Sequence, residues 1–173
     1  MIVYNFCPQC KTKTDKSGEY PKCPKCNITF YKNSKPTTGV LPIKDGKVLL
    51  AIRAEEPFKG TLDIIGGFLK AGEHPIEGVH RELMEETGMK VKIIDLLGIY
   101  TDFYAATGDH TQNTFYIGEL SNGKPKIMDD ISDLKWIRID ELGKHGDEVG
   151  FQCIKDALRD LRKWYKTGRG RRN

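Results

Sequence analysis

One helix, marked at both ends by the sequence itself, most constrains what this chain can fold into. Pro75 suits the first turn of a helix, where the N–H group that proline lacks is not needed. Gly88 can adopt the left-handed conformation that ends many helices. Between them the 3.6-residue period predicts a helix over about 75–87. Its buried side is expected to consist of Ile76, Val79 and Leu83.

Three carboxylates share another side of this helix. Glu82, Glu85 and Glu86 fall within an arc of about 100°, next to the apolar stripe. Like charges at this spacing cost roughly 0.2–0.5 kcal/mol per pair. No cation of the helix is expected in the arc, so an external cation is the natural compensation. Carboxylate oxygens favour Mg²⁺ or Mn²⁺. A solvated acidic face is the commoner meaning of such a pattern, and the context of the helix decides between the two.

That context is a double glycine. Gly66 and Gly67 lead into the helix, and a backbone without Cβ atoms can approach a metal or a phosphate closely. Glu73 and Arg81 flank the acidic cluster. The pattern therefore favours a metal site over a merely solvated face.

The rest of the chain predicts strands around two helices. Apolar runs at 38–43 and 47–52 flank Asp45-Gly46, a strong hairpin signal. Further strands are expected at 91–100, 114–120 and 134–139, and a second helix at about 151–165. This order predicts a mixed sheet with helices on its faces, an α/β layered domain. On the second helix, Cys153 is expected to lie off the apolar stripe, with no nearby histidine to make it a catalytic thiol.

The other four cysteines form two C-x2-C pairs. Cys7, Cys10, Cys23 and Cys26 have the spacing of a four-thiolate Zn²⁺ site, and about 35 residues supply too little core to fold without one. Two disulfides are the rival interpretation, which the lack of a signal-peptide pattern disfavours. The sequence predicts a zinc ribbon over 1–35. Its role is either a structural clip or a docking surface for nucleic acid or protein.

Charge divides the chain into three parts. The predicted ribbon carries +5 and residues 162–173 carry +6, whereas residues 36–161 carry −7. We expect 36–165 to form the main domain and 166–173 a disordered basic tail. No apolar run approaches the ~20 residues of a membrane span, so a cytoplasmic location is expected. The basic ends leave nucleic acid as a partner that is open but not favoured.

The helix and its approach carry a family resemblance. Gly67, Glu73, the run 81–83, the pair 85–86 and Gly88-Met89 fill every fixed position of a pattern that resembles the signature of the Nudix hydrolases. The resemblance spans about Thr37 to the second helix. It implies an α/β/α sandwich and hydrolysis of a nucleoside diphosphate linked to another moiety. Some members also carry an N-terminal four-cysteine zinc ribbon.

The resemblance also implies roles for single residues. Glu82 and Glu86 match the principal Mg²⁺ ligands, and Glu85 a further ligand; all three are the candidate catalytic residues. The carbonyl of Gly66 matches a backbone ligand. Supporting positions, which fix the loop against the helix, are Gly67, Glu73 and Arg81. The general base is left open among Glu82 and three other carboxylates, Glu119, Asp129 and Asp130.

Departures from the family pattern bear on the substrate. Leu62–Ile65 stands where many members have Trp and Pro, and His74 stands where a Ser cap is common. The Ser-, Gln-, Pro- and Trp-rich motif of zinc-ribbon NADH pyrophosphatases is missing, so NADH is not the first expectation. We expect a nucleotide sugar or dinucleotide-type compound such as ADP-ribose. Aromatic residues that could stack on a base, or that merely pack the core, are Tyr100, Phe103, Tyr104, Phe115 and Tyr116.

Three alternatives stay open. The first is an (oxidised) nucleoside triphosphate pyrophosphohydrolase. The second is a non-catalytic nucleotide- or RNA-binding module, which the complete set of glutamates disfavours. The third is an RNA-processing enzyme tethered by its basic tail, for which binding should weaken steeply with salt. A homodimer is also open, since no interface is evident in the sequence.

Overall fold

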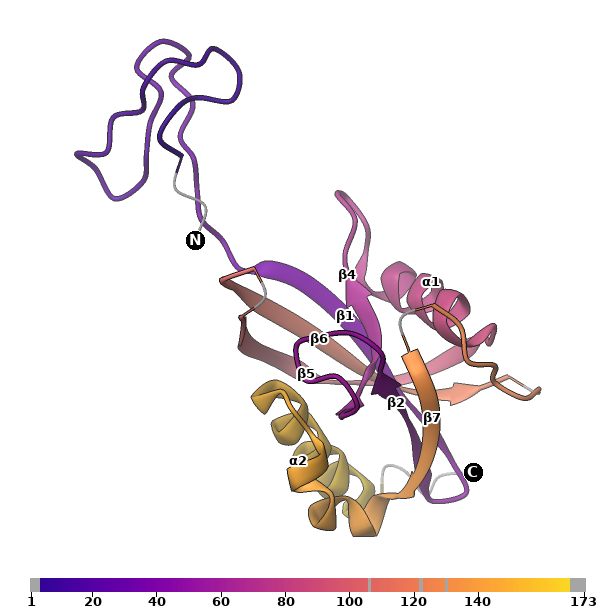
Figure 1. Ribbon diagram of the computed structural model, residues 1–173. Helices are drawn as coiled ribbons and strands as arrows, with labels where there is room; N and C mark the ends of the chain where they lie inside the picture. The colour runs from indigo at the N-terminus through magenta and orange to yellow at the C-terminus, as the bar shows by residue number, and fades with distance from the viewer. Residues whose placement is uncertain (1–3, 106, 122, 130, 169–173) are drawn as a thin grey trace.

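One mixed sheet organises the chain. A computed structural model describes residues 4–168 apart from 106, 122 and 130 (Figure 1). The sheet follows the order β3-β2-β1-β6-β5, with β4 added to β1 and β7 to β2. Only β1 and β6 run parallel among the described strand pairs. The strands are β1 Lys35–Lys44, β2 Lys47–Arg53, β3 Leu62–Asp63, β4 Ile65–Phe68, β5 Val91–Tyr104, β6 Asp109–Leu120 and β7 Ile131–Arg138.

The predicted hairpin is confirmed. Asp45 and Gly46 have φ values of 48° and 71°, the left-handed conformation that a tight two-residue turn requires. The turn sets the register, with Ile43 opposite Val48. The strands expected at 91–100, 114–120 and 134–139 are also present, and all three are longer; β7 begins at Ile131 and ends at Arg138. β5 and β6 pair as far as Tyr104 and Asp109, and the register of β5 shifts between Leu96 and Gly98.

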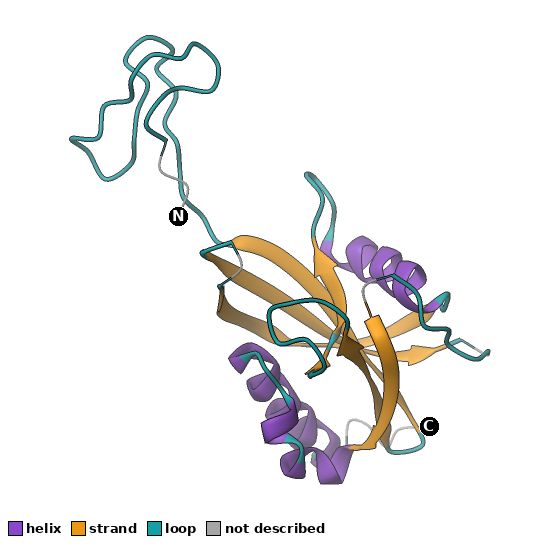
Figure 2. Ribbon diagram, viewed as in Figure 1, coloured by secondary structure: helices purple, strands orange, loops and turns teal. Residues whose placement is uncertain are grey.

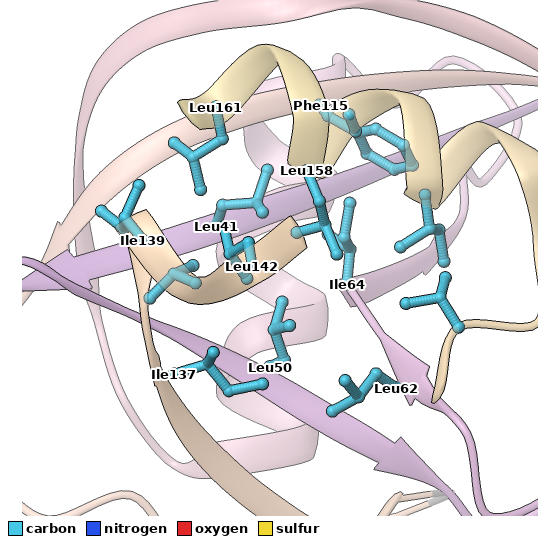
Figure 3. Close-up of a cluster of buried hydrophobic side chains, with 14 of the residues drawn as sticks. Leu41, Leu50, Leu62, Ile64, Phe115, Ile137, Ile139, Leu142, Leu158 and Leu161 are labelled. Atoms are coloured by element: carbon cyan, nitrogen blue, oxygen red, sulfur yellow. The ribbon is translucent and has the colours of Figure 1, made fainter. Parts of the chain in front are cut away.

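Two helices cover opposite faces of this sheet (Figure 2). The α1 helix (Pro75–Thr87) packs over β1 and β4, and the α2 helix (Gln152–Lys166) packs over β5. Successive strand residues alternate between two buried clusters. Leu41, Val48 and Leu50 face α2, whereas their neighbours Val40, Leu49 and Ala51 face α1. Figure 3 shows Leu41 and Leu50 in the α2-side cluster. The predicted α/β/α sandwich is confirmed.

Local capping explains the bounds of α1, which match the prediction. Gly88 takes φ 66° and donates its N–H to the carbonyl of Met84. At the other end His74 replaces the common serine: its Nδ1 accepts the N–H of Ile76 at 3.2 Å. The Glu77 carboxylate accepts the N–H of His74 at 3.1 Å, which completes a capping box. The departure at His74 therefore preserves the cap.

The second helix corrects one expectation. Cys153 does not lie off the buried stripe: it is 5% exposed and packs in the α2-side core. Burial, with Asp102 nearby, raises the pKa of this thiol well above its usual range. Trp164 is also buried, and its Nε1 donates to Asp95 at 2.8 Å. The predicted position of Cys153 was wrong because α2 buries a broader face than a single apolar stripe.

The N-terminal residues form a separate small ribbon that projects from the start of β1 (Figure 1). Single β-bridges join Phe6 to Lys13 and Lys22 to both Asp15 and Thr29. β1 begins at Lys35, next to the predicted boundary, and Lys166 belongs to α2 rather than to a tail. Residues 169–173 lie outside the described residues, so the three-part division stays a prediction. Neither α1 nor α2 is long and apolar enough to cross a lipid bilayer.

The α2-side core predicts a large cost for truncating Leu161, which is fully buried. Leu161→Ala removes contacts from both the helix and the sheet, and we expect a loss of about 2–5 kcal/mol in the free energy of unfolding. Urea denaturation followed by circular dichroism measures it. Leu96→Ala is the control, since Leu96 is 50% exposed, and it should cost under about 1 kcal/mol. Equal losses in the two variants would contradict this account of the core.

Candidate active site

The signature carboxylates of α1 occupy three different environments. Glu86 is buried, 3% exposed, and lines a cavity of about 30 Å³ together with Gly66 and Asp63. Glu82 is half-buried and lies against Gly67, where a Cβ atom would stand 2.6 Å from Oε1 of Glu82. Glu85 is exposed. The structure thus brings Glu82 and Glu86 to the double glycine and leaves Glu85 at the rim.

The double glycine is required by close backbone approach. Gly66 pairs with Gly39 across β4 and β1 and has φ 154°. A Cβ atom at Gly66 would lie 2.1 Å from the carbonyl oxygen of Thr38, a distance that side chains do not tolerate. Gly66 therefore fixes the path that carries the chain from the sheet toward α1.

Arg81 ties the acidic cluster together. Its Nε and Nη2 donate to both carboxylate oxygens of Glu73 at 2.7 and 2.8 Å, and Nη2 also reaches the carbonyl of Phe68 at 3.1 Å. Its Nη1 donates to Glu82 at 2.6 Å and to Glu85 at 3.1 Å. The expected Arg81–Glu73 pair is present. The expectation that no cation reaches the acidic arc was wrong, because the long Arg81 side chain bends into it.

This network fixes the charge state of Glu73. The hydrogen bonds from Arg81, joined by the backbone N–H of Lys70, lower the pKa of Glu73 to about 2. The same carboxylates raise the pKa of Arg81 above its ordinary value. Glu73 and Arg81 therefore remain an ion pair at any pH at which the protein would work.

A second cavity of about 100 Å³ adjoins the first and shares Arg53, Asp63 and Gly66 with it. Arg53 pairs with Asp63 at 2.5 Å, and its guanidinium lies 5.1 Å from the ring centre of Phe151. Arg53 thus stands at the junction of an acidic cavity and an aromatic one. The aromatic residues that line the larger cavity are Phe68, Tyr104, Phe115 and Phe151.

Only some of these aromatic lining residues were predicted from the sequence. Tyr104 and Phe115 line the cavity, whereas Tyr100, Phe103 and Tyr116 are not among its lining residues. The floor was missed: Thr37 donates to Asn113 at 2.6 Å, and Asn113 donates to Thr111 at 3.1 Å. All three floor residues are buried. Polar residues on two strands that pair in parallel gave no sequence signal of their proximity.

The further carboxylates lie in two places. Glu119 is exposed on β6, opposite Lys92, and is not among the lining residues of either cavity. Asp129 follows Met128, whose N–H donates to the carbonyl of Glu86 at 3.0 Å. The segment that carries Asp129 is therefore bonded to the last turn of α1, and Asp129 is not among the lining residues of either cavity. Asp130 lies outside the described residues.

The four ribbon cysteines converge. One sulfur from each of Cys7, Cys10, Cys23 and Cys26 lies within 4.8 Å of the others. Hydrogen bonds from Thr12 lower the pKa of Cys10 to about 6, which favours the thiolate that binds metals. Within the described residues no other group of three or more potential ligands gathers this tightly. The glutamates of α1 are more widely spaced, with Glu82 and Glu85 both bonded to Arg81.

Comparison with known proteins agrees with this geometry. The family model described as the NUDIX domain matches residues 33–157. The chain belongs to the Nudix family. It is a Nudix-type hydrolase with the sandwich and the signature that the sequence predicted, and Nudix hydrolases use divalent metal cations.

Two curated relatives show how far the likeness extends. An ADP-ribose pyrophosphatase of Methanocaldococcus jannaschii is 36% identical over 116 residues, 67% of this chain and 68% of that protein. The NAD-capped RNA hydrolase NudC of Chromobacterium violaceum is 31% identical over 144 residues, 80% of this chain and 52% of NudC. The chain thus spans about half the length of that relative.

Solved structures support the fold. A Nudix hydrolase from Nitrosomonas europaea has a TM-score of 0.77 at 23% identity, covering 95% of this chain and 93% of its own. The Nudix domain of Shewanella oneidensis NrtR, solved with ADP ribose, has a TM-score of 0.64 at 22% identity over 83% of this chain and 93% of its own. At these identities the likeness establishes the fold alone.

The Glu73–Arg81 pair predicts a pH-dependent stability. The pKa of Glu73 is about 2 in the folded chain against an ordinary value of 4.5, so the stabilisation is present above 4.5 and is lost as the pH falls toward 2. Glu73→Gln should lower the melting temperature at pH 7, and the gap to the unaltered protein should narrow by pH 3. Thermal unfolding at several pH values measures it, with the exposed Glu55→Gln as control. A gap that stays constant would contradict the assignment.

Proposed function

We propose that the chain hydrolyses the pyrophosphate linkage of an ADP-ribose-like compound, a nucleoside diphosphate joined to another moiety. One observation carries this: a carboxylate cavity beside the double glycine adjoins an aromatic cavity, with Arg53 at their junction. A diphosphate with an organic group at its end needs both environments. The names of the Methanocaldococcus and NrtR relatives, one acting on and one solved with ADP ribose, support the same substrate class.

We further propose that Mg²⁺ or Mn²⁺ is held by Glu82 and Glu86, with Glu85 and the carbonyl of Gly66 as additional ligands. The residues fit such an ion: Glu86 presents a buried carboxylate to a cavity, and the missing Cβ of Gly67 leaves room for the Glu82 carboxylate. These hard oxygen donors suit both metals. When bound, the ion neutralises phosphate charge and supplies an oriented water.

The protein's own groups divide the remaining work. Arg81 fixes Glu82 and the loop at Glu73, so the carboxylate keeps its position during turnover. Arg53 supplies positive charge where the diphosphate would pass from one cavity to the other. The aromatic wall receives the base or terminal sugar and excludes water from it. For the proton of the attacking water, the candidate bases are Glu82, which lies against Gly67, and Asp129, whose neighbour Met128 is bonded to the backbone of Glu86.

A second substrate has specific support. The NudC relatives are named NAD-capped RNA hydrolases, and their matches include about four-fifths of this chain. An RNA cap of this kind contains the same pyrophosphate linkage. A nucleoside triphosphate is the third candidate, supported by a MutT-like protein of Streptomyces ambofaciens that is 30% identical over 126 residues, 73% of this chain and 77% of its own. Cytoplasmic location and homodimerisation stay predictions from the sequence.

A hydrolysis screen with a matched pair of variants tests the proposal. ADP-ribose, NAD-capped RNA, NADH, nucleotide sugars and triphosphates are compared in the presence of Mg²⁺, and we expect AMP release from ADP-ribose to be fastest. Glu86→Gln should lose at least about 10²-fold in kcat with its fold kept. Glu141→Gln should keep full activity, because this carboxylate of the 3-10 helix Ile139–Lys144 pairs with Lys144 and lines neither cavity. Retention of more than about a tenth of kcat by Glu86→Gln would overturn the ligand role.

We also propose that the four ribbon cysteines hold one Zn²⁺. Their convergence supports this, and the β-bridges of the ribbon supply too few apolar contacts to fold it alone. Atomic absorption should give about one zinc per chain, falling to near zero for Cys23→Ser. Cys153→Ser is the control, since Cys153 lies in the α2-side core and should leave the zinc content unchanged. Zinc-free protein with an intact ribbon would contradict the proposal.

A further inference from the structure

A recess of about 300 Å³ lies at the hairpin end of the sheet, where β1 turns into β2. Lys44 and Lys47, on either side of the turn, line it together with Trp136 of β7 and Lys124. The double glycine contacts β1 near Thr38, and six residues of strand, about 20 Å, separate Thr38 from Lys44. The recess is therefore distinct from the candidate active site.

Strand register places these groups on one face. Lys44 stands directly opposite Lys47, and the next pair, Ile43 and Val48, belongs to the α2 side of the sheet. Since residues alternate along a strand, the two lysines point to the α1 side. Trp136 is there too, because it stands opposite Leu49, a member of the α1-side core.

The recess gathers three lysines, Lys44, Lys47 and Lys124, around one tryptophan. Like charges directly opposite one another in a hairpin repel. Among the described residues, ion pairs occupy other lysines, such as Lys35 with Asp109 and Lys135 with Glu148, but none joins a carboxylate to Lys44, Lys47 or Lys124. Among the described residues that line the recess, Asp45 is the one carboxylate. This excess of cations lies within a part of the chain, residues 36–161, that is acidic as a whole.

The recess combines a partly buried indole with three lysines, so it offers both an apolar surface and positive charge. The lysines attract an anion with several oxygens, and the ring of Trp136 offers a flat apolar face. We propose that this recess binds a nucleoside phosphate, with the phosphate on Lys44, Lys47 and Lys124 and the base against Trp136. The nucleoside phosphate is either a free nucleotide or one unit of a single-stranded RNA. The site stands independently of the proposed hydrolase activity.

Tryptophan fluorescence tests the site in the full-length protein. Trp136 and Trp164 are the two tryptophans of the chain, and Trp164 is 9% exposed on the opposite face of the sheet. AMP at low salt should quench the emission saturably. Trp136→Phe should abolish the quenching. Inorganic phosphate alone should compete for the site without quenching as strongly as AMP.

Matched lysine variants locate the binding. Replacing Lys44, Lys47 and Lys124 together by Gln should raise the Kd for AMP at least about tenfold, whereas Lys155→Gln, an exposed lysine on α2, should leave it unchanged. Tighter binding of oligo(A) than of AMP identifies RNA as the source, and equal binding identifies free nucleotide. Absence of saturable quenching by both ligands overturns the proposal. So does an unchanged Kd in the triple variant. Neither result bears on the hydrolysis screen, so failure of the two proposals is distinguishable.

Discussion

The rest of the site depends on the five hydrogen bonds of Arg81. Its guanidinium joins the loop after β4, through the Phe68 carbonyl and Glu73, to two carboxylates of α1. A planar guanidinium with fixed donor directions can hold all of these at once, whereas an ammonium group cannot. The loop and the helix thereby keep a constant relation to each other. The position of Glu82 therefore depends on Arg81.

Backbone contact between β1 and β4 supplies the second constraint. Gly39 and Gly66 approach so closely that neither position has room for a larger residue, since a Cβ at Gly39 would lie 2.9 Å from Ile64. Both the acidic cavity and the aromatic cavity are lined by this short segment, since Asp63, Ile64 and Gly66 belong to both. A substrate with a charged centre and an aromatic end could therefore contact both cavities at this one segment. The architecture and the proposed chemistry therefore follow from one close approach.

Local signals predicted the local structure, and tertiary contacts decided the rest. The bounds of α1 follow from Pro75 and Gly88, and the hairpin from Asp45-Gly46, because each signal acts on its own neighbours. The aromatic cavity was only partly foreseen, because it joins Phe68, Tyr104 and Phe151 from three elements far apart in sequence. The expected single stripe could not place Cys153, since α2 buries a broader face that includes Cys153, Ala157 and Trp164.

Helical periodicity also failed to place the side chain of Arg81, and its actual position bears on whether a metal is needed. A wheel treats a side chain as a direction, whereas a long arginine reaches across the arc to Glu82 and Glu85. Its single positive charge is nonetheless set against Glu73, Glu82, Glu85 and Glu86. A diphosphate would add further negative charge beside this excess of carboxylates and would be repelled. Arg81 is committed to holding the loop, and Arg53 carries one charge that is paired with Asp63. A divalent cation held by Glu82 and Glu86 would supply the further positive charge that an anionic substrate needs.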